Sequence, residues 1–421
     1  MVVCTCTGCA ILCEDIELIV ENNEIKEIFS ACRMGVSRFV NNSDRIESNK
    51  GIINGENVDI DNAINKAKEI LNNSENILLF GWANSTLEAQ KKGIELAKKY
   101  SAYLDDTSSF CQGITLDAIM KNKNKIKTCT LDEVRNKADL IIYWGADPSN
   151  SHPRHLSKYS YFPRGELRQR GWEEERTMIT LDVRESHTAT LCKEKDPDHF
   201  YEIPPHDDHQ FINALLQIMD GKVPKYNKID KKRLFKLYST LKKAEFGVIF
   251  VGLGLVHSIK NNFDILLQLM DKLNAISEFY LIPMVGHYNM RGFNQTLFET
   301  TGYINRVKFD RNEVKHGIEY SVIELLKNKS VDAMLCIGSD PYASLPRSIF
   351  KEKGDKIKII VINPANTLTS KVSEVVIPSA ISGIECSGTA IRMDGVKVEL
   401  QKVIDSQYLS DEEIIDRLIK G

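Results

Sequence analysis

The sequence predicts a mixed α/β protein whose sheets are mainly parallel. Short apolar runs recur along its 421 residues, and each run ends in a turn rich in Gly, Asp, Pro, Ser or Thr. Segments with helical apolar spacing separate these runs, and this alternation is the one from which parallel sheets are wound. A chain of this length also exceeds what one hydrophobic core usually serves. We therefore expect more than one α/β domain.

The composition is that of an ordinary globular protein. Hydrophobic residues make up 42% of the chain, and 55 basic residues face 58 acidic ones. This near-balance leaves no basic surface typical of nucleic-acid or membrane binding. No export signal is visible at the N-terminus, and no apolar run is long enough to span a bilayer. We expect a cytoplasmic protein with no nucleic-acid partner and no membrane insertion.

The first 35 residues carry the densest chemical motif. Cys6, Cys9 and Cys13 have C-x2-C-x3-C spacing, and Cys32 follows as a fourth thiol. Four thiolates at this spacing can cage a four-iron, four-sulfur (4Fe4S) cluster. The segment between Cys13 and Cys32 must then fold back, and two short alternating runs around residues 22–23 predict a hairpin with an Asn-Asn turn.

Two other interpretations of these cysteines stay open. A structural zinc site more naturally uses two matched CxxC pairs, and the segment has one such pair. Inert thiols are common in protein cores, but five of the ten cysteines lie within the first 32 residues. The fifth of these, Cys4, is left as a spare or alternate ligand. The spacing favours the cluster.

Six apolar runs follow in order and predict the strands of the α/β frame. They cover residues 76–80, 138–144, 178–183, 247–251, 333–337 and 356–362. The helix-like stretches between and around them include residues 60–71, 87–100, 261–273 and 410–419. Ligands of such folds bind beyond the carboxyl ends of the strands, so the turns after these runs are the candidate binding loops.

Two of these turns share the pattern Gly-x-Asp-Pro, at residues 145–148 and 338–341. Alone, this pattern is most often ordinary turn chemistry, in which Pro sets φ and Asp bonds nearby backbone. Two copies in two halves also suit a ligand with two similar ends, or two copies of one ligand. No GxGxxG or GxxxxGK[ST] motif is present, so nicotinamide and P-loop nucleotide binding lack their strongest evidence.

Cys111 stands apart, at a predicted transition from loop to helix. A helix N-terminus lowers the pKa of a nearby thiol, which suits the thiol to be a nucleophile or a soft-metal ligand. A buried structural cysteine is the open alternative. The remaining cysteines are assigned to core packing, namely Cys129, Cys192, Cys336 and Cys386.

Together these motifs resemble the pterin-dependent molybdenum and tungsten oxidoreductases. The resemblance rests on the four-cysteine motif, Cys111, the two Gly-x-Asp-Pro turns and the segment Val375–Gly395. Within that superfamily, Gly286–Asn289 with Gly292–Gln295, and the loop Phe162–Gly165, look most like the family of formylmethanofuran dehydrogenase B subunits. The similarity runs nearly end to end.

The resemblance implies a fold with a small N-terminal 4Fe4S domain and two Rossmann-like α/β domains. The implied bounds are residues 1–50 for the cluster, 51–130 with 315–421 for one pterin dinucleotide, and 131–314 for the other. Catalytic chains of the superfamily generally end in a β-barrel domain, whereas 26 residues follow Gly395 here. We expect that barrel to be absent from this chain and supplied by another subunit.

The implied cofactors are a 4Fe4S cluster on Cys6, Cys9, Cys13 and Cys32, and a tungsten or molybdenum ion held by Cys111 and two molybdopterin (tungstopterin) guanine dinucleotides. Asp147 and Asp340 are expected to face the two guanines, and Arg33 to lie between the cluster and a pterin. Further implied cofactor-binding residues are Gly81, Ser85, Thr86, Arg184, Thr188, Gly252, Gly254, Asn363, Thr367, Gly388 and Thr389.

Two positions depart from the family pattern. The family's metal-ligating Cys is usually followed by His, where this chain has Gln112, and an Arg commonly precedes the Gly-His-Tyr-Asn run, where this chain has Val285. Gln can only hydrogen-bond, whereas His can exchange a proton. The implied catalytic set is therefore Cys111 and Gln112, with His287 as a titrating group and Arg291 as a guanidinium for a carboxylate product.

By this resemblance the chain is expected to be the catalytic subunit of a formylmethanofuran dehydrogenase complex. It would reduce CO2 reversibly to formate with two electrons from the cluster, the first step of methanogenesis from CO2. The expected partners are an amidohydrolase-like subunit, a β-barrel pterin-binding subunit and ferredoxin-like subunits. Two alternatives stay open: a non-catalytic electron-transfer or scaffold subunit that retains the cluster, and a formate dehydrogenase catalytic subunit.

Overall fold

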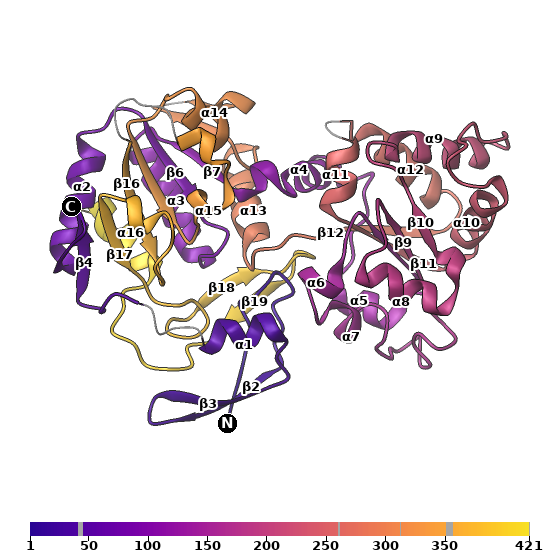
Figure 1. Cartoon of the computed structure of the whole chain (residues 1–421), viewed down its shortest axis with the longest axis horizontal. Coiled ribbons are helices and arrows are strands. Elements are labelled where there is room, and N and C mark those ends of the chain that lie inside the picture. The colour runs from indigo at the N-terminus through magenta and orange to yellow at the C-terminus, as the bar shows by residue number, and fades with distance from the viewer. Residues whose placement is uncertain (41–44, 260–261, 312, 351–356, 421) are drawn as a thin grey trace. The chain divides into compact units, whose positions relative to one another are not determined.

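The structure, a computed structural model, describes residues 1–40, 45–259, 262–311, 313–350 and 357–420. The chain forms two compact units, one of residues 1–113 with 287–421 and one of residues 114–286. The segment that carries the four-cysteine motif belongs to the first unit. The junctions predicted at 130/131 and 314/315 lie further along the chain. The predicted α/β class with parallel sheets is confirmed (Figure 1).

The described part of the first unit contains a nine-stranded sheet with the order β14-β13-β7-β6-β15-β16-β17-β4-β5. Its five central strands, from β7 to β17, are parallel, and the outer strands pair antiparallel. The strands are β4 (Lys50–Ile53), β5 (Glu56–Asp59), β6 (Ile77–Gly81), β7 (Tyr103–Asp106), β13 (Val307–Asp310), β14 (Glu313–His316), β15 (Ala333–Ile337), β16 (Lys358–Asn363) and β17 (Val375–Pro378).

Helices cover both faces of this sheet (Figure 1). One core packs against α2 (Ile60–Asn72), α3 (Leu87–Lys99), α13 (Met290–Thr301) and α16 (Asp411–Lys420), and the other against α14 (Val322–Lys327). Strand β6 shows why its run is apolar throughout: Leu79 enters the first core, whereas Leu78 and Phe80 enter the second. A strand buried on both faces needs apolar side chains at every position.

The cysteine segment folds as the sequence predicts. Strands β1 (Val2–Cys4), β2 (Ile16–Glu21) and β3 (Glu24–Phe29) form an antiparallel sheet, and α1 (Arg33–Val40) follows Cys32. Asn22 and Asn23 both have positive φ, at 51° and 62°, which gives the tight hairpin turn between β2 and β3. The hairpin β18 (Gly388–Ile391) and β19 (Lys397–Leu400) supports the loop, because Met393 donates to Ala10 O at 3.1 Å.

The second unit holds a parallel five-stranded sheet with the order β10-β9-β8-β11-β12. Its strands are β8 (Leu140–Trp144), β9 (Thr177–Asp182), β10 (Phe200–Glu202), β11 (Phe246–Val251) and β12 (Glu278–Pro283). Its helices are α5 (Leu131–Lys137), α6 (Pro148–Ser151), α7 (His155–Lys158), α8 (His187–Lys195), α9 (Asp208–Met219), α10 (Lys231–Lys243), α11 (Leu253–Ile259) and α12 (Asp264–Asn274), and α4 (Gly113–Lys121) begins at the junction. Nowhere in the described ranges does a helix combine the length and apolar character needed to cross a bilayer.

Two buried histidines lie beneath the turn that follows β8. His152 contacts Val285 O through Nε2 at 2.8 Å, and His155 contacts the Tyr143 hydroxyl through Nδ1 at 2.9 Å. Burial lowers the pKa of His152 to about 4, and it lowers the pKa of His155 well below the ordinary value. Both rings are therefore neutral in the folded unit at neutral pH.

We expect this unit to lose stability as the pH falls from about 6.5 to 4. In that window the unfolded chain binds protons at His152 that the folded chain does not bind, so unfolding becomes more favourable, by about 2–3 kcal/mol at pH 4. Hydrogen exchange of strands β8 and β11 across this pH range measures the loss. His152→Gln, which does not titrate, should flatten the profile, and an unchanged profile in that variant would contradict the assignment.

Candidate functional site

The loop between β1 and β2 gathers three of the four motif cysteines. Cys6, Cys9 and Cys13 are buried, and Cys32 is half-buried immediately before α1. The loop closes on itself, because Cys6 N donates to Cys13 O at 2.9 Å and Leu12 N donates to Cys9 O at 3.2 Å. The backbone thus holds these thiols on one short loop, with the fourth supplied from the end of the β2–β3 hairpin.

Two glycines keep space around one of these sulfurs. Gly8 N donates to Cys6 Sγ at 3.3 Å. A Cβ placed on Gly8 or on Gly35 would lie only 3.3 or 3.2 Å from the same sulfur. Side chains at these positions would crowd Cys6 from two directions.

The four thiols also influence one another electrostatically. Burial raises the pKa of Cys6 to about 12, and the Cys13 and Cys32 thiols add to the rise. Burial likewise raises the pKa of Cys9, again with contributions from the other three. Ionised thiols here therefore require a compensating positive charge.

The donor set can be compared with the groups that the sequence suggested. Over the described ranges, no group of three or more His, Cys, Asp or Glu side chains is arranged to hold a single metal ion. A cubane cluster separates its four cysteine sulfurs more widely than one tetrahedral ion does. Four mutually interacting thiols are a donor set of the kind that iron-sulfur clusters use.

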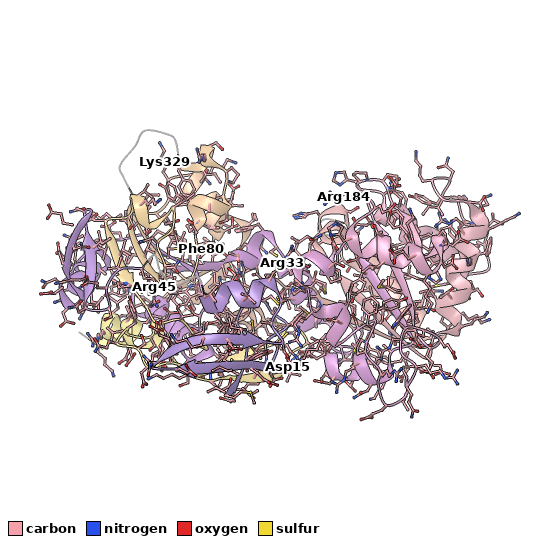
Figure 2. All side chains as sticks on the ribbon, turned by 60° about the horizontal axis from the view of Figure 1, so that its bottom comes forward. Asp15, Arg33, Arg45, Phe80, Arg184 and Lys329 are labelled. Atoms are coloured by element: carbon pink, nitrogen blue, oxygen red, sulfur yellow. The ribbon has the colours of Figure 1, made fainter. Side chains whose placement is uncertain are left out.

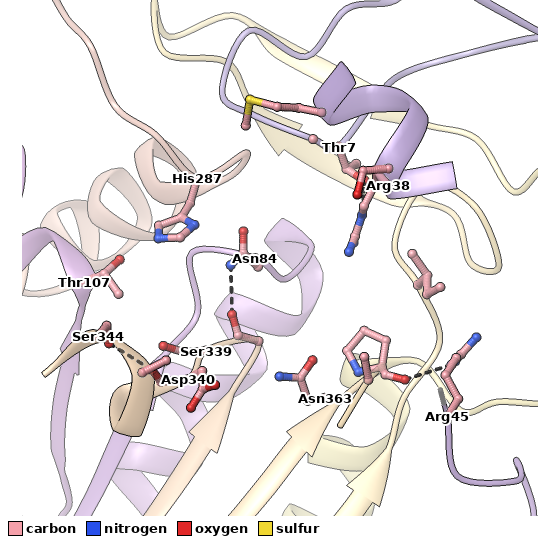
Figure 3. A pocket seen from close by; sticks show the side chains of 18 of the residues that line it. Thr7, Arg38, Arg45, Asn84, Thr107, His287, Ser339, Asp340, Ser344 and Asn363 are labelled. Atoms are coloured by element: carbon pink, nitrogen blue, oxygen red, sulfur yellow. Dashed lines mark hydrogen bonds between the residues drawn. The ribbon is translucent and has the colours of Figure 1, made fainter. Parts of the chain in front are cut away.

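A cavity of about 890 Å³ opens beside the cysteine loop, within the first unit. It is lined by Thr7 and Gly8 of the loop, by α1, and by the turns that follow β6, β15 and β16. Figure 3 shows Arg38 and Thr7 on one side of it, with Asn84, Ser339 and Asn363 from the strand ends below. The cavity therefore lies at the sheet edge where the sequence predicts ligands.

The lining is cationic. Arg33, Arg38 and Arg45 all line the cavity, together with His287, against the single carboxylate of Asp340 among the lining residues that the structure describes. Arg45 is committed to the protein: it donates to Glu385 Oε1 at 2.6 Å, and its guanidinium lies 3.8 Å from the centre of the Tyr408 ring. An anionic ligand with polar ends suits such a lining.

The two Gly-x-Asp-Pro turns make matching hydrogen bonds, one turn in each unit. Asp147 Oδ1 accepts from Thr188 N at 3.2 Å and from Thr188 Oγ1 at 2.6 Å. Asp340 Oδ1 accepts from Thr369 N at 3.0 Å and from Thr369 Oγ1 at 2.5 Å. Each carboxylate thus fastens the loop after the neighbouring strand, and each turn begins at a glycine with positive φ.

The structure brings some predicted site residues together and leaves others apart. Arg33, His287, Asp340 and Asn363 line the cavity. Asp147, Arg184, Thr188, Gly252 and Gly254 belong to the second unit, where a Cβ on Gly252 would lie 2.0 Å from Gly145 O. Of the first unit's predicted residues, those outside the cavity lining are Gly81, Ser85, Thr86, Thr367, Gly388, Thr389, Arg291, Gln112 and Cys111.

Several of these residues have internal partners. Thr86 caps α3 by accepting from Ala89 N, Ser85 donates to Asp411 at 2.8 Å, and Thr389 donates to Glu88 at 2.6 Å. Sequence reasoning missed other lining residues, namely Thr7, Ser37, Arg38, Arg45, Asn84, Thr107, Ser339 and Ser344. The strand-end turns were a usable signal for Asn84 and Ser339, because both lie within turns that the apolar runs predict.

Cys111 differs from the sequence expectation. It is half-buried between the short 3-10 turn Thr107–Phe110 and α4. Burial raises its pKa to about 11, and the nearby Asp106 carboxylate adds to the rise, although the Gln112 backbone N–H opposes it. The predicted lowering of this thiol's pKa is wrong, because burial outweighs the helix N-terminus. The unligated thiol is therefore protonated at neutral pH.

Arg291 is buried at the start of α13 and is not part of the cavity lining. Burial lowers its pKa, whereas Asp394 acts in the opposite sense. Asp394 is itself engaged by Arg392, which donates to it at 2.8 and 2.9 Å. Arg291 therefore does not line the cavity that His287 lines.

Comparison with known proteins places the chain in a family. A protein from Methanocaldococcus jannaschii, named as the B subunit of tungsten-containing formylmethanofuran dehydrogenase 2, is 36% identical over 429 aligned residues, which cover 99% of this chain and 97% of the relative. The chain belongs to the family of formylmethanofuran dehydrogenase B subunits. The protein of the same name from Methanococcus maripaludis is 34% identical over the same shares of both chains. No family model matches the sequence.

A solved structure shares the fold of this B-subunit family member. It is a chain of the formyltransferase/hydrolase complex from Methylorubrum extorquens, crystallised with methylofuran. The TM-score is 0.67 at 19% identity, and the match covers 87% of this chain and 97% of that chain. The α/β frame therefore also occurs in a complex named for formyl transfer and hydrolysis.

These comparisons contradict the prediction that this chain is the catalytic subunit for CO2 reduction. The relatives' names give tungsten to the dehydrogenase and identify the matching chain only as its B subunit. The shared fold occurs in a complex whose name describes no reduction, so the fold itself does not imply that chemistry. The findings favour the non-catalytic alternative.

We expect Asp340→Ala to destabilise the first unit even without any ligand. The substitution removes the acceptor of three donors, Leu368 N, Thr369 N and Thr369 Oγ1. We expect the free energy of unfolding to fall by about 1–3 kcal/mol. Urea unfolding of the cofactor-free chain measures the loss. Asp147→Ala is the matched variant and should weaken the second unit similarly. Unchanged stability in both variants would show that the carboxylates are kept for a ligand instead.

Proposed function

We propose that this chain is the B subunit of a formylmethanofuran dehydrogenase complex and acts as an electron-transfer and scaffold subunit. The observation that carries the proposal is the convergence of four thiols beside a cationic cavity. Sequence relatives that match 99% of the chain support its place in such a complex. The CO2-reducing step is not assigned to this chain.

The proposed electron carrier is a 4Fe4S cluster on Cys6, Cys9, Cys13 and Cys32. When bound, such a cluster stores and passes single electrons. The protein's part is to exclude water from three of the sulfurs, to leave room at Cys6 and to donate Gly8 N to that sulfur. Hydrogen bonds to the sulfurs and solvent exposure are the levers that set a cluster's potential.

The proposed ligand of the cavity is a pterin guanine dinucleotide, the cofactor that the resemblance implies. Arg33 and Arg38 suit its pyrophosphate, and the Asn84, Asn363 and Ser339 side chains suit its polar rings and sugar. Asn84 is fixed for this by donating to Gly338 O at 2.9 Å. This part of the proposal concerns binding alone. The tungsten that names the relatives is not assigned to Cys111.

The proposed partners are the other subunits of the complex, including amidohydrolase-like, β-barrel and ferredoxin-like subunits. Exposed apolar side chains near the cysteine loop support such contacts: Val3 on β1 is 56% exposed and Phe29 on β3 is 43% exposed. The strand register places Val3 and Phe29 on either side of Glu17, so the three share one face of the small sheet. Apolar residues on an outer sheet face favour a covered surface in the complex.

Anaerobic purification of the chain tests the cluster. We expect about four iron and four sulfide per chain, with a reduced-state EPR signal. Cys9→Ser should lose the iron, because it removes one of the four ligands. The matched control is Cys192→Ser, which alters a buried thiol of the second unit that is assigned to core packing and should keep the iron. One metal ion per chain, or full iron in the Cys9 variant, would refute the cluster.

A second experiment tests the non-catalytic assignment in the assembled complex. If this chain carries electrons without ligating tungsten, Cys111→Ala leaves CO2 reduction and tungsten content unchanged. Turnover and metal content are measured together, with Cys336→Ala as a control for loss of a buried thiol. Loss of tungsten and turnover in the Cys111 variant alone, with the cluster signal intact, would overturn the assignment and restore a metal-ligating role.

A further inference from the structure

Helix α1 presents two arginines to the cavity, and they lie in different surroundings. Arg33 is exposed at the first position of the helix, whereas Arg38 is half-buried near its end. Figure 2 shows Arg33 on the ribbon of this helix, and Figure 3 shows Arg38 beside Thr7 with its guanidinium directed into the cavity. Sequence reasoning had singled out Arg33, because it directly follows Cys32.

Arg38 is fixed to the loop that carries the cysteines. Its Nε donates to Thr7 Oγ1 at 3.1 Å, and Thr7 Oγ1 in turn donates to Ser382 O at 3.0 Å. Thr7 directly follows Cys6 in the chain. The guanidinium therefore keeps a defined position between the cysteine loop and the cavity.

The positive charge of Arg38 acts on its buried neighbours. It lowers the pKa values of Asp411 and Tyr288, against the burial that raises both. Within the described chain Arg38 forms no ion pair, whereas Arg45 pairs with Glu385 at 2.6 Å. Unlike Arg45, Arg38 thus lies beside the cysteine loop without a carboxylate that pairs with it in the described chain.

We propose that Arg38 is a positioning residue that sets the reduction potential of the cluster and joins it electrostatically to an anionic ligand in the cavity. This inference rests on the proposed cluster. A cluster gains one negative charge when it is reduced, so a fixed nearby cation stabilises the reduced form and raises the potential. The exposed charge of Arg33 is screened by water and salt and contributes much less.

The test is an EPR-monitored redox titration of the full chain with its cluster, using Arg38→Gln, Arg38→Met, Arg38→Lys and Arg33→Gln. Both neutral Arg38 variants should move the midpoint to a more negative potential. We expect the ratio of reduced to oxidised cluster at a fixed potential to fall about tenfold, which is 59 mV for a one-electron couple. Arg38→Lys keeps the charge, so its midpoint should lie close to that of the wild-type chain. Arg33→Gln, the matched control on the same helix, should move the midpoint far less.

Iron is counted in every variant, so the possible failures can be told apart. A wild-type chain without iron overturns the proposed function and this inference with it. A full cluster whose midpoint is unmoved in the neutral Arg38 variants, or moved equally by Arg33→Gln, overturns the role of Arg38 alone. A shift that Arg38→Lys does not reverse also overturns it, because a purely structural role would not depend on charge. The Met variant keeps the alkyl stem and serves if the Gln variant does not retain its iron.

Discussion

Four thiols close together cannot all ionise unless positive charge compensates them. In this chain burial raises the pKa values of Cys6 and Cys9, and each neighbouring thiol raises them further. Elements distant in the sequence are arranged around this constraint. The β2–β3 hairpin returns the chain so that Cys32 joins the other three, and the β18–β19 hairpin supports the loop from below. Glycines leave space at Cys6, and Arg38 brings a positive charge to the loop from α1. The cavity opens beside this arrangement, so its ligand and the thiols share one electrostatic environment.

The paired Gly-x-Asp-Pro turns illustrate how a motif can be real and yet do a different task from the one expected. Each Asp accepts two hydrogen bonds from a single Thr beyond the next strand, and this fixes the strand-end loops in both units. A carboxylate that accepts these hydrogen bonds has fewer free lone pairs with which to bind a guanine base. The main task of the repeated motif is therefore to hold the strand-end loops in place, as ordinary turn chemistry does. What distinguishes the two copies is their setting, because Asp340 lines a cavity rich in arginine.

Local patterns predicted the fold well, because strands, turns and caps depend on residues close in sequence. The apolar runs, the Asn22–Asn23 turn and the cysteine spacing all belong to this class. The site was harder, because its chemistry depends on partners far apart in the chain. Arg45 meets Glu385 across 340 positions and Thr389 meets Glu88 across 301, and no local signal marks either pair. The prediction of a lowered pKa for Cys111 was wrong for the same reason. A favourable helix N-terminus is a local feature, whereas burial is a property of the whole fold.

The charged groups around Cys111 differ from those around the cysteine loop. Beneath this thiol lie two buried acids, and burial raises the pKa of Asp105 to about 6 and that of Asp106 to about 8. Ionising the thiol would place a negative charge beside Asp106, whose raised pKa leaves that carboxyl largely protonated at neutral pH, and Gln112 stands where a histidine could have carried a positive charge. The cysteine loop has the opposite balance, because Arg38 approaches it from the cavity side. The same α/β frame also occurs in a formyltransferase/hydrolase complex. The fold alone therefore does not distinguish Cys111 from the cysteine loop as a site of redox chemistry. What differs between the two places is the neighbouring charged group, an arginine at the cysteine loop and an acid beside Cys111.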